Sequence, residues 1–339
     1  MKHHPDPPAG ARDEPSPPDA GRFVEYEAGI LWIRLPIPGA LRHINVWLVP
    51  ARRGWFLVDT GMKTADVEAV WEALGRQLPL AAGLESIVVT HHHPDHYGMA
   101  RRLSERYGVA VAMTGRAAAA ADAAVAEGPH DRSEGPDGFA DRLGIHLDDD
   151  MRAILRGGIY RRIVSGRADT VPLTDSWHGW RVGVHDGHAP GHACLLREDE
   201  RILISGDQLL PTISSNVSLY PSNEEGDPLG DFLASLERLS TLHAETLILP
   251  AHGRPFRTPL ARIDALRQEH AGRLARIREL CVAPRSTQEV ATSLYRFERL
   301  DALNRLLAVT ETLAHLRRLE IEQVIVREFA AGTVLWRTP

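Results

Sequence analysis

A cluster of ligand-type side chains at residues 91–96 constrains this sequence of 339 residues more than any other feature. The cluster reads His-His-His-Pro-Asp-His, and its spacing is carried by His91, His93, Asp95 and His96. It directly follows the apolar segment 87–89 and precedes a segment with helical periodicity. A tight loop between a strand and a helix can aim such side chains into one cavity, and imidazole and carboxylate groups bind zinc and other transition metals. The spacing therefore predicts a metal site at the end of a buried strand.

Strands and helices are expected to alternate on both sides of this cluster. Short segments rich in Val, Ile, Leu and Trp predict strands at residues 30–35, 44–49, 55–58, 87–89, 109–113, 181–185, 193–196, 201–205 and 246–249. Apolar residues at helical spacing predict helices at about residues 64–78, 99–107 and 229–239. Thr64 is the expected N-cap of the first helix. This alternation within each half of the chain predicts an α/β fold with an αββα sandwich.

The two ends of the chain differ from this core. Residues 1–21 are rich in Pro, Asp and Gly and are expected to form a disordered leader before a main domain over residues 22–258. Residues 115–165, Ala-rich and then polar, predict a helical insertion that covers the site. Residues 259–339 are expected to form a long helix and then a small winged-helix domain.

The winged-helix prediction rests on the pattern of the tail. Helices are expected at about residues 287–294, 300–306 and 310–319, and they are followed by a β-like end. On the preceding long helix, His270 and Arg273 are expected to lie on the surface. The tail is only mildly basic, so a domain that shapes the substrate pocket or a dimer interface is as good an expectation as one that binds nucleic acid.

Charge and composition exclude some classes of protein. The formal net charge of −6 argues against an overall electrostatic footprint for nucleic acid. No window approaches the ~18 consecutive apolar residues of a membrane span, and the N-terminus lacks the apolar core of a signal peptide. The two cysteines, Cys194 and Cys281, form no CxxC pair, so a reducing cytoplasm is the expected compartment.

Three later motifs place further ligand-type side chains just beyond predicted strands. His192 ends the sequence Gly-His-Ala-Pro-Gly-His, Asp207 follows Ser-Gly, and His252 lies in Pro-Ala-His-Gly. Active sites of layered α/β folds are built at such strand ends. Each motif alone is weak evidence for a ligand, but the three reinforce one another because all follow the histidine cluster in the chain.

Taken together, these motifs resemble the metallo-β-lactamase-fold hydrolase superfamily over roughly residues 22–280. The resemblance implies two metal sites, with residues 22–258 as the catalytic domain. It assigns His91, His93 and His192 to the first site. It assigns Asp95, His96 and His252 to the second site. Asp207 is the implied bridging carboxylate, and Asp59, in Asp-Thr-Gly, is the implied group that orients ligands.

Details of the resemblance indicate which branch of the superfamily the sequence is most similar to. The family usually has a Gly-Gly pair after the cluster, whereas here Gly98 is followed by Met99, a change that removes no ligand. No cysteine lies in a ligand motif, and Cys194 is expected to be a packed core thiol. The sequence is therefore more similar to the glyoxalase II, thioesterase, lactonase and nuclease branches than to true β-lactamases. Residues 206–236 and the tail resemble hydrolases that carry a small C-terminal winged-helix domain.

The resemblance implies a hydroxide held between two divalent ions, most simply Zn²⁺, although Fe and Mn accept the same ligands. Asp207 bridges the ions, and Asp95 is the expected group that orients the hydroxide and takes its proton. His188 and Tyr220 are candidate proton donors; the simpler expectation is that His188 supports the ligands and Tyr220 contacts substrate. For His185 as well, the sequence leaves open whether it donates a proton or only supports the site.

Three functions follow from the same ligands. The favoured one is hydrolysis of a small-molecule thioester, ester or lactone. The second is a single-strand-specific endoribonuclease, disfavoured by the acidic net charge. The third is a non-hydrolytic relative, either a di-iron protein or a regulatory metal-binding module. A homodimer is a further possible assembly that the sequence leaves open.

Overall fold

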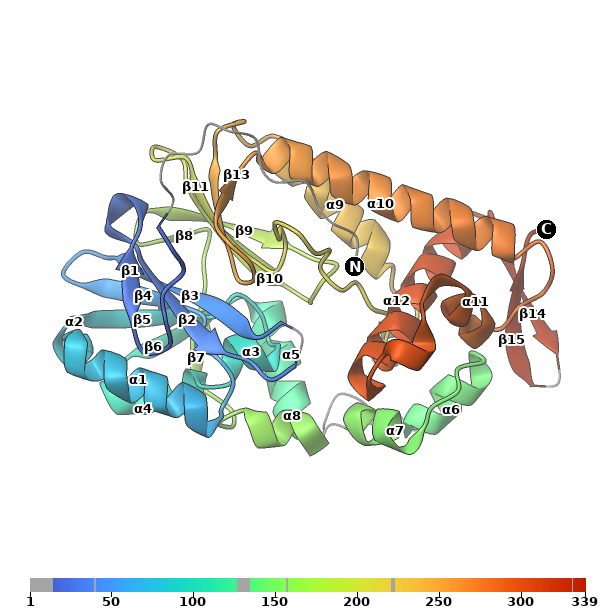
Figure 1. The fold of residues 1–339 in the computed structure, drawn as a ribbon, viewed down its shortest axis with the longest axis horizontal. Coiled ribbons are helices and arrows are strands. Elements are labelled where there is room, and N and C mark those ends of the chain that lie inside the picture. Colours follow the sequence, from blue (N-terminus) through green and yellow to red (C-terminus); the bar gives the residue numbers. More distant parts are fainter. Residues whose placement is uncertain (1–14, 40, 127–134, 157, 221–222, 331) are drawn as a thin grey trace.

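The computed structural model describes residues 15–39, 41–126, 135–156, 158–220, 223–330 and 332–339. Most of the expected leader, residues 1–14, lies outside this range. Two sheets form the centre of the fold (Figure 1). The first has the order β1 (Phe23–Glu25), β2 (Leu31–Pro36), β3 (His43–Pro50), β4 (Trp55–Val58), β5 (Leu84–Val88), β6 (Ala110–Met113) and β7 (Thr170–Pro172). The second has the order β13 (Phe256–Arg257), β12 (Leu247–Pro250), β11 (Ile202–Gly206), β10 (His192–Arg197), β9 (Trp180–His185) and β8 (Ser176–Trp177).

The two sheets pack face to face. Alternate side chains of both meet in a dry core that contains Trp32, Trp47 and Phe56 from the first sheet and Leu195 and Ile204 from the second. These strands are nearly continuous apolar segments because each sheet is also covered on its outer face. The outer layers complete the predicted αββα sandwich, and this prediction is confirmed.

Helices cover the outer face of each sheet. The first sheet packs against α1 (Ala65–Gln77), α4 (Ala100–Tyr107) and α5 (Gly115–Ala126). The second packs against α9 (Pro228–Leu239) and the first half of α10 (Pro259–Leu280). A short helix, α2 (Leu80–Gly83), precedes β5, and a 3₁₀ turn, η1 (Glu27–Gly29), separates β1 from β2.

The first long helix shows that local sequence patterns predicted both the start and the buried face of a helix. In α1, the Thr64 hydroxyl accepts a hydrogen bond from the Val67 amide at 3.3 Å, so the predicted N-cap is confirmed. The apolar positions at helical spacing form its buried face, which includes Trp71 and Leu74. Most other predicted strands and helices agree with the structure to within one to three residues at each end.

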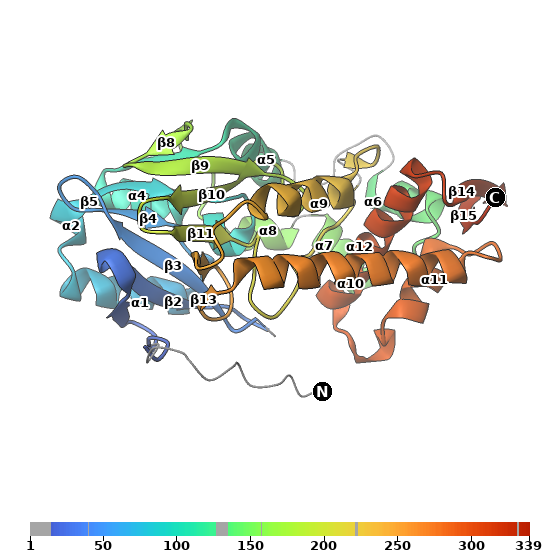
Figure 2. The ribbon, with the colours of Figure 1, turned by 90° about the horizontal axis from the view of Figure 1, so that it is seen from above.

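The C-terminal part forms a second, smaller body at the far end of α10 (Figures 1 and 2). It contains α11 (Thr287–Leu294), the 3₁₀ turn η3 (Phe297–Arg299), α12 (Ala302–Ile321) and the hairpin of β14 (Val326–Ala330) and β15 (Thr333–Arg337). The helices predicted at about 300–306 and 310–319 are one helix, so that prediction of a break was wrong. Thr310 lies inside this helix, and its hydroxyl is satisfied by donating to the Leu306 carbonyl at 2.9 Å. A helix pair and a hairpin are thus present, and the winged-helix description stays a prediction.

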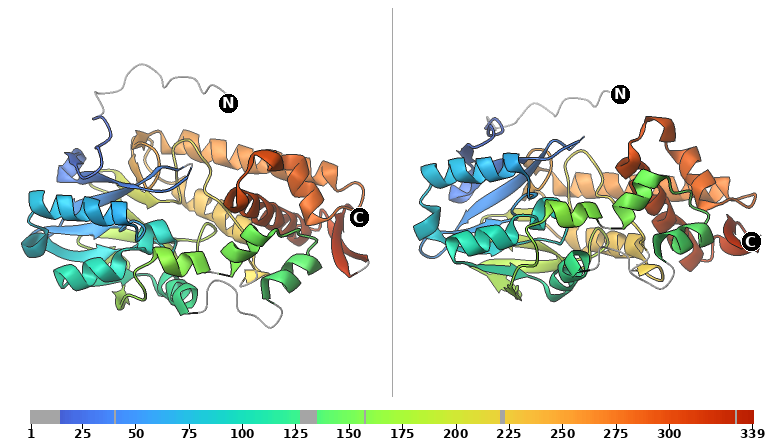
Figure 3. Two further views of the ribbon diagram at one scale, coloured as in Figure 1. Left: turned by 60° about the horizontal axis from the view of Figure 1, so that its bottom comes forward. Right: turned by 90° about the horizontal axis from the view of Figure 1, so that it is seen from below.

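The segment between β6 and β7 contains four helices in its described residues. They are α5, α6 (Gly135–Arg142), α7 (Asp149–Leu155) and α8 (Gly158–Ile163). Leu143, Met151 and Leu155 belong to the same apolar cluster as Leu313 and Trp336 of the C-terminal body. Figure 3 shows this division, with α8 beside the sandwich and α6 and α7 beside α11 and α12. The insertion therefore connects the two bodies.

Two further points concern the whole chain. Among the described residues, no helix combines the length and the apolar character that a membrane crossing needs. Cys194 and Cys281 are both buried free thiols, and the expectation of a packed core thiol at Cys194 is confirmed.

Candidate metal centre

The ligand-type side chains gather at one end of the sandwich because of the strand directions. β4 and β5 run parallel in the first sheet, and β11 and β12 run parallel in the second. Asp59 follows β4, the histidine cluster follows β5, Asp207 follows β11 and His252 follows β12. The carboxyl ends of parallel strands share one edge, so these four segments meet there.

The first half of the histidine cluster is a loop and the second half is a short helix. α3 (Pro94–Tyr97) begins directly after His93, with Pro94 at its first position, where the missing amide proton costs nothing. Met99 replaces the family's second glycine without disturbance: its amide donates to the Gly61 carbonyl at 2.9 Å, and its side chain is buried in the core. Gly98 itself has no room for a Cβ, which would lie 2.4 Å from the Pro94 carbonyl oxygen.

One donor set consists of Asp95, His96 and His252, with one oxygen of Asp207 beside it. The His96 Nε2 atom lies 3.5 Å from Asp95 Oδ2 and 3.5 Å from Asp207 Oδ1. The His252 Nε2 atom lies 3.3 Å and 3.4 Å from the same two oxygens. A tetrahedron around an ion with bonds of about 2.1 Å has edges of about 3.4 Å, so this spacing fits a transition-metal ion.

The second donor set consists of His91, His93, His188 and Asp207, whose ligand atoms all lie within 4.8 Å of one another. His91 Nε2 lies 2.9 Å from His93 Nδ1 and 3.2 Å from His188 Nε2. The His188 Nε2 atom also lies 3.3 Å from Asp207 Oδ2. Asp207 therefore presents one oxygen to each set, as a bridging carboxylate does.

The third histidine of this set is His188 in the structure, whereas the resemblance assigned His192 to it and His188 was expected to support the ligands. The assignment of His192 as a ligand stays a prediction. His192 Nε2 instead accepts a hydrogen bond from the Asp207 amide at 3.1 Å, and its ring stacks on His91 with centroids 4.8 Å apart. The reason is the turn between β9 and β10, which places His188 over the cavity and His192 at the first position of a buried strand.

In four of the histidines, the nitrogen that faces away from the donor set has an acceptor of its own. Nδ1 of His96 donates to Asp59 Oδ2 at 2.7 Å, and Nδ1 of His91 donates to the Thr90 hydroxyl at 3.0 Å. Nδ1 of His188 donates to the Asn216 carbonyl at 2.8 Å, and Nδ1 of His252 donates to the His43 carbonyl at 2.9 Å. Such acceptors fix the tautomer with a lone pair on Nε2, which is the arrangement of metal-binding histidines.

Asp59 orients more than one of these groups. Its carboxylate accepts from the Thr90 amide at 2.8 Å and from the Thr90 hydroxyl at 2.9–3.0 Å, besides the bond from His96. Through Thr90 it also reaches His91. The structure thus places Asp59 where the sequence expected a group that orients ligands.

Several donor atoms are buried without a hydrogen bond. Nε2 of His96, Nε2 of His252 and Oδ1 of Asp207 make no hydrogen bond among the described residues, and they lie 3.3–3.5 Å from one another or from Asp95 Oδ2. Burying polar atoms without partners is costly, so this arrangement favours a bound cation. The donor set therefore fits the divalent metal ions that the fold implies.

The neighbouring charges shift the pKa values of the histidines in the two sets differently. Burial lowers the pKa of His252, but Asp207 and Asp95 outweigh it and raise the pKa to about 10. Burial is likewise outweighed at His96, where Asp95, Asp59 and Asp207 hold the pKa well above its ordinary value. In the other set, burial and neighbouring histidines keep the pKa values of His91 and His93 well below the ordinary value. The pKa values of the two sets are therefore shifted in opposite directions.

Other residues singled out in the sequence lie away from the donor atoms. Tyr220 packs against the apolar cluster of the C-terminal body, and its hydroxyl interacts with Ser218 and Thr310. His185 is buried on β9 with Nδ1 2.8 Å from the Ser235 hydroxyl. Cys194 is a buried thiol of the core, as predicted, and it lies 3.4 Å from the Ser205 carbonyl oxygen.

The prediction that His270 and Arg273 lie on the surface of α10 was wrong. His270 is fully buried, and its Nδ1 lies 3.1 Å from Nε2 of His315 on α12. Arg273 pairs with Glu311 at 2.7 Å, and its guanidinium lies over the Tyr295 ring. These residues are covered because α12 packs along α10, a contact between segments about 40 residues apart.

Sequence reasoning missed some supporting residues of the site. The Tyr160 hydroxyl of α8 donates to the His92 carbonyl at 2.5 Å, and the Ser215 hydroxyl donates to the Asp207 carbonyl. Asn216 and His43 act through their carbonyl groups. No motif marks these residues because each reaches the site from a remote segment. Only Thr90 carried a signal, since it directly precedes the cluster.

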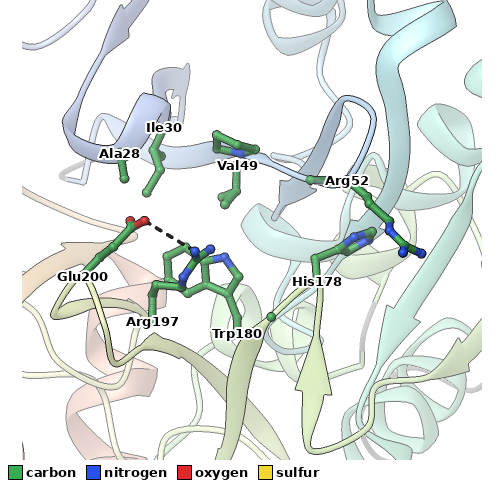
Figure 4. A pocket seen from close by; sticks show the side chains of 11 residues that line it. Ala28, Ile30, Val49, Arg52, His178, Trp180, Arg197 and Glu200 are labelled. Atoms are coloured by element: carbon green, nitrogen blue, oxygen red, sulfur yellow. Dashed lines mark ion pairs between the residues drawn. The ribbon is translucent and has the colours of Figure 1, made fainter.

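A separate cavity of about 550 Å³ lies at the other end of the sandwich (Figure 4). It is lined by Arg52 before β4, by His178 in the turn before β9, by Trp180 at the start of β9, by Arg197 at the end of β10 and by Glu200 after it. The metal-centre residues follow the opposite ends of β4 and β9. The cavity is therefore distinct from the metal centre.

The comparisons with known proteins agree with this geometry. The metallo-beta-lactamase superfamily matches residues 39–252. The chain is 27% identical to a probable metallo-hydrolase, YqjP, of Bacillus subtilis (strain 168) over 91% of this chain and 98% of that protein. The fold is similar to that in the crystal structure of a beta-lactamase domain protein from Burkholderia ambifaria, with a TM-score of 0.85. The two sequences are 34% identical, and the match covers 95% of this chain and 96% of that one.

A shorter match concerns a single segment. A segment of 64 residues is 45% identical to part of a hydroxyacylglutathione hydrolase of Albidiferax ferrireducens (strain ATCC BAA-621 / DSM 15236 / T118). This match covers 19% of this chain and 22% of that protein. The sandwich, the paired donor sets and the two full-length similarities lead to one conclusion: this chain belongs to the metallo-β-lactamase superfamily and is a metal-dependent hydrolase of that superfamily.

Proposed function

We propose that this protein hydrolyses a small-molecule thioester, ester or lactone at a centre of two divalent metal ions, most simply Zn²⁺. The observation that carries the proposal is the position of Asp207, whose Oδ2 faces His188 and whose Oδ1 faces His96 and His252. A carboxylate shared in this way supports two ions side by side. The nitrogen-rich donor atoms and their near-tetrahedral spacing favour zinc.

The side chains around this centre have different proposed roles. His91, His93 and His188 would hold one ion, and Asp95, His96 and His252 would hold the other, with Asp207 between them. Two ions held here would activate a shared water and polarise the scissile carbonyl oxygen.

Asp95 is the side chain that we propose to orient the attacking water and take its proton. Its Oδ2 lies 3.3 Å from His252 Nε2, at the edge of the donor set. His188, earlier a candidate acid, is not proposed as a proton donor, because its Nε2 lies among the donor atoms and its Nδ1 is bonded to Asn216. A thiolate leaves without a general acid, so a thioester needs the fewest groups from this site.

Two further observations support the choice of substrate class. The 64-residue segment similar to a hydroxyacylglutathione hydrolase relates part of this chain to a protein named for the hydrolysis of a glutathione conjugate. In addition, no cysteine lies in the donor sets, and Cys194 is buried with a pKa that burial raises well above its ordinary value. Both free cysteines suit the reducing cytoplasm that the sequence predicts, which stays a prediction.

The test is turnover by the zinc-loaded full-length chain on two substrates, a hydroxyacyl thioester of glutathione and a fluorescent single-stranded RNA. We expect thioester hydrolysis that Asp207→Ala reduces by roughly a thousandfold or more, because Lewis-acid stabilisation supplies several kcal/mol and each 1.36 kcal/mol is tenfold in rate. Asp199→Ala, at an exposed position after β10, is the matched control and should keep full activity. Cleavage of RNA alone, lost in Asp207→Ala, would overturn the proposed substrate class in favour of the endoribonuclease.

A further inference from the structure

The cavity at the other end of the sandwich is lined by a buried donor that has no acceptor. Trp180, at the start of β9, is 1% exposed, and its indole Nε1 makes no hydrogen bond among the described residues. Burying a polar group without a partner is costly, so a ligand that supplies one is favoured beside it. The indole N–H can only donate, and the missing partner is therefore an acceptor.

The walls of this cavity come from both sheets. Figure 4 shows Ile30 and Val49 on one side and Trp180 across from them. Ile30 precedes β2 and Val49 belongs to β3, and both are buried aliphatic side chains. The volume of about 550 Å³ lies within the range of sites for small organic ligands. Such sites bury an apolar body against residues of this kind and orient it with few polar groups.

The hairpin of β8 and β9 fixes the aromatic side of the cavity. His178 and Gly179 are its two turn residues, with φ of +46° and +85°, the signs that a type I′ turn requires. The His178 ring stacks on Phe56 with centroids 5.2 Å apart, and the Trp180 ring meets Phe56 edge-on at 6.4 Å. Because these rings are already held, a ligand that binds here orders few side chains.

One positive charge on the lining is uncompensated. Arg197 pairs with Asp199 at 2.9 Å and with Glu200 at 3.5 Å, the pair that Figure 4 marks with a dashed line. Arg52 also lines the cavity, and among the described residues no carboxylate pairs with its guanidinium. A carboxylate in the cavity would satisfy the indole donor and balance this charge.

A second cavity supports the sign of the charge. It has a volume of about 890 Å³ and shares Arg52 and His178 with the first. Arg53 and Glu85 complete its lining, and the Glu85 carboxylate accepts from the Arg53 backbone amide at 2.6 Å. Two guanidinium groups thus face one carboxylate around Arg52, which favours an anionic ligand over a cationic one.

We propose that the cavity at Trp180 binds a small carboxylate with an apolar body, separately from the metal centre. The apolar body lies against Ile30 and Val49, and the carboxylate accepts from Trp180 Nε1 and faces Arg52. The inference goes beyond the proposed hydrolysis and does not depend on it.

The experiment measures equilibrium dialysis of three probes against the zinc-loaded full-length chain. Naphthoate carries a carboxylate, naphthamide a neutral acceptor, and naphthylmethylammonium a positive charge without an acceptor. The naphthalene fluorescence gives the free concentration of each probe. The variants are Trp180→Phe, which keeps a ring but removes the donor, and Arg52→Gln. The matched controls are Trp177→Phe, whose indole N–H is bonded to the Ser86 hydroxyl at 3.2 Å, and Arg76→Gln, at an exposed position of α1.

We expect naphthoate to bind at one site per chain with a Kd of about 1 mM or below. Naphthamide should bind more weakly, and naphthylmethylammonium should not saturate. Trp180→Phe should weaken naphthoate binding by about tenfold, because it removes a hydrogen bond to a charged group. Arg52→Gln should weaken naphthoate by about two- to fivefold and leave naphthamide unchanged, since this charge is exposed.

A carboxylate could also bind to the zinc ions, so Asp207→Ala is measured as well and should bind naphthoate like the wild type. Loss of binding in Asp207→Ala would place the probe at the metal centre and overturn the inference. Absence of saturable naphthoate binding would overturn it, as would an equal loss in Trp177→Phe and Trp180→Phe. Should Trp180→Phe fail to fold, the preference for naphthoate over naphthamide and its reduction in Arg52→Gln decide the matter, and no preference would contradict the proposed ligand.

Discussion

Asp59 is the residue on which most of the donor geometry depends. Its φ of +63° lies in the left-handed region, which Asp tolerates better than most residues. In this conformation its carboxylate faces His96 and Thr90 together. A strained backbone at this position is retained because one short side chain orients two ligands.

Replacing Asp59 should therefore weaken metal binding rather than abolish folding. In Asp59→Asn, one of the two acceptor oxygens becomes an amide donor, so His96 or Thr90 loses its partner. We expect zinc affinity to fall by about 10- to 100-fold in chelator competition. Asp66→Asn, on the exposed face of α1, is the control and should have no effect. Unchanged affinity in Asp59→Asn would contradict its assigned role.

The raised pKa values of His252 and His96 predict a pH dependence of metal binding. The pKa of His252 is raised to about 10, with burial outweighed by Asp207 and Asp95, and that of His96 is raised in the same direction. Between about pH 7 and pH 10, an incoming ion must displace these protons. The apparent zinc affinity should rise about tenfold per pH unit for each proton displaced. Chelator competition at several pH values measures this slope, and a flat profile would argue against protonated ligands.

At the scale of elements, the Asn45 side chain makes several of the hydrogen bonds that join the two sheets beside the metal centre. Asn45 of β3 donates from Nδ2 to the carbonyls of Pro250 and Gly253, both at 2.9 Å. Its Oδ1 accepts from Trp32 at 2.8 Å and from Arg34 at 3.2 Å. All four hydrogen-bonding positions of this amide are used, and they connect β2 and β3 with the loop that carries His252.

Asn45→Leu should be strongly destabilising. It would remove the acceptor of the buried Trp32 indole and the Asn45 donor of the Pro250 carbonyl, at about 1–3 kcal/mol for each buried group, while the Gly253 carbonyl would keep Arg34 as a donor. We expect the free energy of unfolding in urea to fall by about 3 kcal/mol or more. Asn223→Leu, at an exposed position, is the matched control. A loss of less than about 1 kcal/mol would show that this link contributes little.

The packing of α10 on α12 predicts a second pH dependence, one of stability. Burial and Arg273 lower the pKa of His270 to about 4, and burial lowers the pKa of His315 to about 3. The unfolded chain binds protons at these histidines near pH 6.5, so the unfolded state gains protons first as the pH falls. Stability is therefore full above about pH 6.5 and is lost below it, by about 1.4 kcal/mol per pH unit for each histidine.

Urea unfolding of the C-terminal body between pH 7 and pH 5 tests this slope. The double variant His270→Leu, His315→Leu should flatten it, because both members of the pair are replaced by apolar groups. His243→Gln, at an exposed histidine, should leave the slope unchanged. An equal slope in the wild type and the double variant would assign the acid sensitivity to other groups.

For the whole molecule, the metal centre lies where the two sheets meet, so bound ions should stabilise the native state. Ions present at 1,000 times their Kd would contribute about 4 kcal/mol. We expect a chelator to lower the Tm of the wild type by several degrees and to change that of Asp207→Ala much less. Differential scanning calorimetry measures both. An unchanged Tm in the wild type would mean that the sandwich does not depend on its ions.

The sequence by itself determined the fold class and the types of ligand. Apolar strands that end in ligand-type side chains are local patterns, and parallel strands bring their carboxyl ends to one edge without any detail of packing. The sandwich, the site near residues 91–96 and the ligand-type side chains of Asp207 and His252 could be predicted in this way, whereas the role of Asp59 was implied only by the family resemblance.

Only the tertiary structure decided which of two nearby histidines faces the donor atoms. His188 and His192 lie four residues apart in one motif, and the choice depends on the Asp207 amide and the Asn216 carbonyl, both from the segment after β11. The burial of His270 likewise depends on α12, far along the chain. Local patterns specify side-chain chemistry, whereas the partner that each nitrogen meets is set by contacts between remote segments, which no single window of sequence contains.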